Sequence, residues 1–304
     1  MHKGLVAAAK KAATCDLSKR SFNYKCEDYK AAKKVVTSLY RKHPAKLIET
    51  LSVLVGSKDA NTSKVAAYLA GESRTTASLA YLLRKKKPLE PNTGVRFLKA
   101  LEKKAKDGNK WEAFRLATIA THVASITGKV SEAVKTMKGL AQPQLKARVL
   151  KHLMRYGRMN AFPTIQEMAK SPKPLYQKAA LAAPNKMYKW TDDEKKKLCP
   201  LGMVYLSHKD LGVAARAVRI LVTCKGKYVE ALLKEGKKRV KAGEWKKLFV
   251  MLYRDICFKG FLGRSKIPPE KTCKKVYKFL EWVANQKNVE PFYRGWALSM
   301  IYYQ

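Results

Sequence analysis

Basic residues recur at helical spacing in several parts of this 304-residue chain. Five basic sets show the pattern: Lys30, Lys33 and Lys34; Arg96, Lys99, Lys103 and Lys106; Arg148, Lys151, Arg155 and Arg158; Lys234, Lys237, Lys238 and Lys241; and Lys271, Lys274, Lys275 and Lys278. Residues three, four or seven positions apart fall on one side of an α-helix. Arg can hold a phosphate through two parallel hydrogen bonds, whereas Lys supplies a point charge, so such rows suit a polyanion.

A solvated helix face is the ordinary explanation for one such row. Acidic residues are few at the neighbouring helical positions, so ion pairing within a helix does not account for the five basic sets. Like charges at this spacing destabilise a helix by a few tenths of a kcal/mol per pair. Five recurrences of one sign therefore favour a binding surface, and we add Arg216 and Arg219, which share the spacing.

The charge balance supports this interpretation. Lys and Arg number 64 and Asp and Glu number 23, which gives a net charge of +41 at pH 7. Each successive block of about fifty residues carries between +6 and +8. The charge therefore belongs to the whole folded chain, which excludes both a neutral domain and a basic tail attached to one.

Nucleic acid, DNA or RNA, is the expected partner. The sequence has no zinc-finger spacing, no basic-zipper heptads and no RNA-recognition signature, so we expect contacts with phosphates and shape and little sequence preference. An anionic envelope polymer or an acidic protein is the alternative partner. No membrane span is expected, because the apolar runs are far shorter than the ~20 residues that a spanning helix needs.

The residues between these sets predict the elements that position them. Gly and Pro recur at intervals of about one helix, and apolar residues between them follow helical spacing, as at Leu145, Val149 and Leu153. Alternating strand-like runs are scarce. We therefore expect an all-α fold in which residues 1–304 form a single helical-repeat domain, with an irregular helical globule as the alternative.

One segment carries a family resemblance. Asp210 is followed by Arg216 and by Ala and aliphatic residues at helical spacing, and residues 210–224 resemble the second helix of a HEAT-type repeat. The resemblance implies a HEAT-like or armadillo-like α-solenoid of stacked antiparallel helix pairs. Some HEAT-like proteins are DNA glycosylases with a Trp-x-x-x-Asp pattern. Here Trp190 is followed by Glu194 and Trp111 by Arg115, so this activity is kept only as a second alternative.

We expect no enzymatic activity. The sequence has no HExxH, GxSxG, Walker or dinucleotide-binding motif, and it implies no cofactor. No Cys or His residues have the spacing of a zinc site, so no metal is expected. The acidic run Asp192, Asp193 and Glu194 is typical of a first helical turn, with Thr191 or Asp192 as its N-cap.

The six cysteines leave two possibilities open. Three sequence-local pairs bracket helical hairpins, as disulfides would in an oxidising compartment: Cys15 with Cys26, Cys199 with Cys224, and Cys257 with Cys273. Buried free thiols are the other possibility. Paired cysteines would indicate a periplasmic or extracellular protein, a disulfide-stapled scaffold that adheres to anionic polymers. Free cysteines would indicate a compartment that contains nucleic acid.

Overall fold

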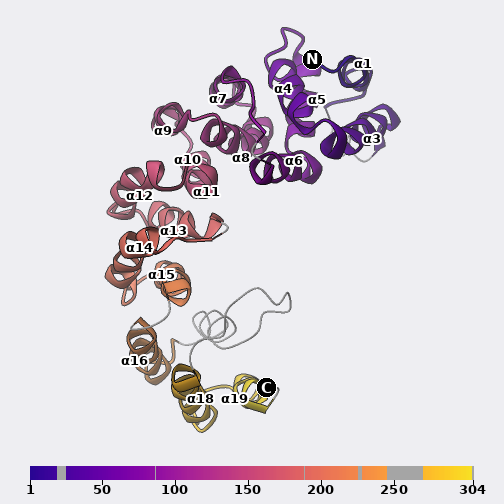
Figure 1. Ribbon diagram of the computed structural model, residues 1–304. Coiled ribbons are helices and arrows are strands. Elements are labelled where there is room, and N and C mark those ends of the chain that lie inside the picture. Colours follow the sequence, from indigo (N-terminus) through magenta and orange to yellow (C-terminus); the bar gives the residue numbers. More distant parts are fainter. Residues whose placement is uncertain (19–24, 86, 188, 225–227, 245–269, 303–304) are drawn as a thin grey trace. The chain divides into compact units, whose positions relative to one another are not determined.

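The chain is all-α, as its sequence predicts. The computed structural model describes residues 1–18, 25–85, 87–187, 189–224, 228–244 and 270–302, and these contain helices and no strand (Figure 1). Among the described helices, none has the length and apolar character that crossing a bilayer would require. The residues divide into two compact units, Met1–Glu167 and Met168–Gln304. The single domain expected over residues 1–304 stays a prediction.

The helices of both units are short and follow one another closely. Unit 1 contains α1 (Lys3–Ala12), α3 (Glu27–Lys42), α4 (Pro44–Leu54), α5 (Ala60–Ala70), α6 (Ser73–Arg84), α7 (Asn92–Lys106), α8 (Lys110–Ile126), α9 (Val130–Gly139), α10 (Pro143–His152), α11 (Met154–Gly157) and the 3-10 turn Arg158–Ala161. Helix α12 (Phe162–Ala169) spans the boundary. Unit 2 contains α13 (Pro174–Ala182), the 3-10 turn Pro184–Lys186, α14 (Asp192–Tyr205), α15 (Leu211–Cys224), α16 (Tyr228–Lys241), α18 (Glu270–Ala284) and α19 (Pro291–Tyr302).

Several of these helices begin at a polar cap that the sequence signals. The Asp59 carboxylate accepts hydrogen bonds from two backbone N–H groups at the start of α5. Thr191 and Glu194 form a reciprocal capping box at α14, which confirms Thr191 as the cap. Asp210 accepts from two backbone N–H groups of α15, so the polar cap of the HEAT-like segment is present. These acidic side chains satisfy helix ends that would otherwise lack partners.

Helix α7 lies unusually close to α8, and a glycine makes this possible. A Cβ atom on Gly94 would lie 2.5 Å from the Thr127 hydroxyl oxygen and 2.9 Å from the Ala124 Cα. The apolar side of α7, including Phe97 and Leu101, is fully buried. This contact fixes which side of α7 faces solvent, and therefore where its lysines point.

We expect Gly94→Ala to destabilise unit 1 by about 1–3 kcal/mol, because the added methyl group must push α7 away from α8. The free energy of unfolding in urea, followed by circular dichroism, measures the change. Gly139→Ala is the matched control, since no atom lies within 4 Å of its Cβ position. Equal stability of the two variants would contradict the close α7–α8 contact.

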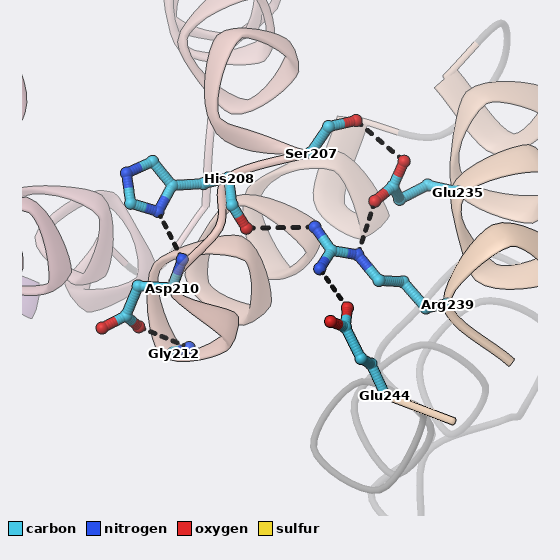
Figure 2. A network of polar contacts seen from close by, with 7 residues as sticks. All are labelled: Ser207, His208, Asp210, Gly212, Glu235, Arg239 and Glu244. Carbon is cyan, nitrogen blue, oxygen red and sulfur yellow. Dashed lines mark hydrogen bonds and ion pairs between the residues drawn. The ribbon is translucent and has the colours of Figure 1, made fainter. Parts of the chain in front are cut away.

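In unit 2, a buried ion-pair network holds α16 against the turn between α14 and α15 (Figure 2). Arg239 donates to Glu235 at 2.7 Å, to Glu244 at 2.5 Å and to the His208 backbone carbonyl at 3.0 Å. The Ser207 hydroxyl donates to Glu235 at 2.8 Å. Burial lowers the pKa of Arg239, but the two carboxylates outweigh this effect and raise it overall.

Removal of one carboxylate from this network should destabilise unit 2. We expect Glu235→Ala to lower the free energy of unfolding of unit 2 by about 3 kcal/mol, because Arg239 stays buried with one partner fewer. Glu230→Ala is the control on the same helix; its carboxylate pairs with Lys275 at the surface, and its loss should cost less than about 1 kcal/mol. Denaturant titrations of both variants test the difference.

Two of the three expected cysteine pairs lie at disulfide distance. Cys15 and Cys26 join the end of α1 to the N-cap of α3, with Cα atoms 6.1 Å apart. Cys199 and Cys224 join α14 to the end of α15, with Cα atoms 6.0 Å apart. The placement of these four cysteines fits the paired alternative, and their oxidation stays a prediction. Cys257 lies outside the described residues, so its pairing with Cys273 stays a prediction.

Each described disulfide closes a loop, of 11 and 25 residues in sequence separation. Reduction should destabilise its unit by about 3 kcal/mol per bond, because the unfolded chain gains conformational freedom. Thiol alkylation followed by mass spectrometry should leave all four cysteines unmodified before reduction and modified after it. Modification of unreduced protein at these positions would contradict the pairing.

Candidate nucleic-acid interface

Helix α7 presents a basic set in which one of the four residues has a carboxylate partner. Lys99, Lys103 and Lys106 are exposed and make no ion pair with the described residues. Arg96 is different, because its guanidinium donates two hydrogen bonds to Glu90, at 2.9 and 3.0 Å. Three of the four expected residues on this helix are thus available to an anion in solution.

A basic pocket of about 510 Å³ opens beside these lysines. It lies between α7 and the turn that joins α4 to α5. Five cationic side chains line it, against the single carboxylate of Asp107: Lys58, Arg96, Lys99, Lys103 and Lys104. This excess of positive charge makes the pocket a candidate anion-binding site in unit 1.

The sequence analysis did not predict two of the cations that line the pocket, Lys58 and Lys104. Lys58 comes from the turn before α5, and only tertiary folding brings it to α7. Lys104 lies off the exposed row of α7 and is 8% exposed. Burial lowers the pKa of Lys104, and the Glu112 carboxylate opposes this effect. Helical spacing alone signals neither residue.

The set at residues 148–158 leaves the helical row at its last member. Helix α10 ends at His152 and Arg155 lies on the short α11, but Leu153 between them keeps α-helical dihedral angles, so Arg148, Lys151 and Arg155 follow one helical path. Arg158 begins a 3-10 turn with a positive φ of 45°, so the expected row is wrong for this residue. Arg155 donates to the Tyr156 hydroxyl, which leaves Lys151 as the exposed lysine of this set.

The set on α3 is largely neutralised. Lys30 pairs with Glu27 at 2.6 Å and Lys33 with Glu72 at 3.4 Å, while Lys34 is exposed and makes no ion pair with described residues. The expectation that ion pairing within a helix plays little part is wrong for Lys30, whereas the partner of Lys33 lies outside α3. Figure 1 shows α3 and α7 separated by α4–α6, so these two sets do not merge within unit 1.

In unit 2, by contrast, the sets on α16 and α18 lie along one shared edge. Glu230 of α16 pairs with Lys275 of α18, and seven residues further along each helix Lys237 lies over the Trp282 ring at 5.6 Å. Because both contacts are separated by seven residues on each helix, α16 and α18 run in the same direction along this edge. Lys278 therefore lies about level with Lys234, and the two sets form a continuous basic edge.

The remaining lysines of this edge are well exposed. Lys234, Lys238 and Lys241 make no ion pair with described residues, and Lys274 and Lys278 are also exposed. The side chain of Lys271 lies outside the described part of the chain. On α15, Arg219 is exposed and Arg216 is half-buried.

The residues considered for glycosylase chemistry have structural partners. Glu194 is buried and accepts a hydrogen bond from the Thr191 backbone in the capping box. The Trp190 indole donates to the Pro184 carbonyl at 3.1 Å. No group of three or more His, Cys, Asp or Glu side chains in the described part of the chain is placed to hold a metal ion.

Comparison of the chain with known protein families, curated proteins and solved structures found no match. What the protein does must therefore be inferred from its own side chains. Two features stand out for this purpose: the pocket beside α7 in unit 1 and the basic edge of α16 and α18 in unit 2.

Proposed function

We propose that this chain is a non-enzymatic binder of polyanions, with DNA or RNA as the main partner. The lysines of α7, α16 and α18 would contact phosphates and displace their condensed counterions, which favours binding on any sequence. Base identity would contribute little, because the lysines on these helix faces would contact the sugar–phosphate backbone of the nucleic acid and not its bases. The proposed interface comprises the basic pocket and the basic edge.

One observation carries this proposal: exposed lysines gather without carboxylates to neutralise them. Of the five cations that line the basic pocket, Lys58, Lys99 and Lys103 are exposed and make no ion pair with described residues. On the basic edge, Lys234, Lys238 and Lys241 make no ion pair with described residues, and Lys275 pairs with Glu230. The lysines within each cluster repel one another in the free protein, and a bound polyanion relieves this repulsion.

We also propose that the helices stack as a HEAT-like solenoid. Helices adjacent in sequence pack together in each unit, as α7 does with α8 and α14 with α15. The parallel edges of α16 and α18 are typical of equivalent helices in successive repeats. Stacking of this kind would place basic helices side by side and extend the surface along a polymer.

A second candidate function is adhesion to an anionic polysaccharide outside the cytosol. The two cysteine pairs favour it, because disulfides persist mainly in oxidising compartments. Competition separates the candidates. If nucleic acid is the partner, excess single- or double-stranded DNA should displace labelled DNA at lower charge equivalents than a sulfated polysaccharide does.

Neutralisation of α7 tests the main proposal. In Lys99→Gln/Lys103→Gln/Lys106→Gln, the slope of log K against log salt for a DNA duplex should become shallower by about 2–3, since each lost phosphate contact removes about 0.9. Fluorescence anisotropy at several salt concentrations gives the slope. The loss should be similar for unrelated duplex sequences.

The control variant removes the same charge from lysines that already have carboxylate partners. Lys30, Lys195 and Lys196 pair with Glu27, Asp192 and Asp193 respectively. Their triple replacement by Gln should change the slope by less than half as much. An equal effect of both variants would remove α7 from the interface, and a flat salt dependence of the wild type would refute polyanion binding.

A further inference from the structure

Exposed aromatic rings on α8 lie among the cations of unit 1. Trp111 is 49% exposed and Phe114 is 39% exposed. Three residues apart, they are neighbours on the helix surface, together with Arg115. Large exposed rings are uncommon on so highly charged a protein, and rings of this kind commonly mark a binding surface.

Arginine side chains lie over aromatic rings in the same place. The Arg148 guanidinium carbon is 3.9 Å from the centre of the Phe114 ring. The Arg148 Nε is buried and has no hydrogen-bond partner in the described structure. Next to it, the Arg115 guanidinium lies 4.3 Å from the centre of the Tyr68 ring. We call Trp111, Phe114, Arg115 and Arg148 the aromatic–arginine patch.

A buried contact holds the two helices of this patch in place. The rings of His122 on α8 and His152 on α10 approach within 3.0 Å of each other in the interior, and His122 is 1% exposed. The Phe114–Arg148 contact lies further along the same pair of helices, at the surface. The patch is therefore positioned by the core and does not depend on a loop.

We infer that the aromatic–arginine patch binds unpaired bases, so that the protein prefers single strands to duplex. Aromatic rings and guanidinium planes stack on bases of any sequence, but a base within a duplex is already stacked and out of reach. Lys110 and Lys151 are exposed one helical turn from Phe114 and Arg148, where they would contact the flanking phosphates. This inference rests on the proposed function and specifies its ligand.

The test compares three probes of equal length on the full chain: single-stranded DNA, an abasic strand and a duplex. For the wild type, we expect single-stranded DNA to bind at least about tenfold more tightly than the abasic strand, from the stacking of one or two bases. Trp111→Leu/Phe114→Leu should abolish this difference and leave the affinity for the abasic strand and its salt dependence unchanged. Phe292→Leu removes a ring that is 74% exposed in unit 2 and should change nothing.

The outcomes distinguish this inference from the proposed function. Salt-dependent binding of all three probes with equal affinity would overturn the role of the patch and leave polyanion binding intact. Failure of the wild type to bind any probe would overturn both. An equal loss on all three probes in the double variant would show that the rings support the fold, and a circular dichroism melt of that variant would confirm it.

Discussion

Self-repulsion is the constraint that the rest of this structure must satisfy. At a net charge of +41, compaction brings like charges together, and packing between helices must offset the cost. The interior is accordingly built from small and aliphatic residues, with close approaches such as Gly94 of α7 against α8. The buried Arg239 is held between two carboxylates, those of Glu235 and Glu244.

Some of the 23 acidic residues support the fold, and others pair with surface lysines. Asp59, Glu194 and Asp210 satisfy helix N-termini, and Glu235 fixes a buried arginine. Capping does not prevent a carboxylate from pairing with a lysine as well, since Asp210 also lies 2.9 Å from the Lys178 ammonium group. The scarcity of acids is therefore the main reason why the lysines of α7 and α16 make no ion pair with the described residues. Stability and surface charge are thus consequences of one distribution of carboxylates.

Local features of the sequence predicted local structure well. Apolar periodicity indicated an all-α chain, the Thr191 cap and the Asp210 cap are present, and sequence-local spacing identified two cysteine pairs. Each of these depends on residues close together in the chain. Spacing could not show that Arg158 leaves the helical path with a positive φ, because the basic residues at 148–158 keep a helical spacing up to that position.

The spacing of residues in the sequence could not predict contacts between side chains of different helices. Glu72 neutralises Lys33 from 39 positions away, and Lys58 reaches the α7 pocket only through the packing of α4 and α5. Phe114, the ring over which Arg148 lies, also belongs to a different helix. Such contacts depend on how helices pack, which is set by the whole interior.

The distribution of available cations argues for a polymer as the ligand. A compact anion needs one convergent site, and the pocket beside α7 would suffice for it. The edge of α16 and α18 is different, since its lysines run along two helices that face solvent and extend in one direction. A ligand that meets charge at several steps along such an edge must itself repeat its charge. A chain of phosphates has that property, and a single phosphate does not.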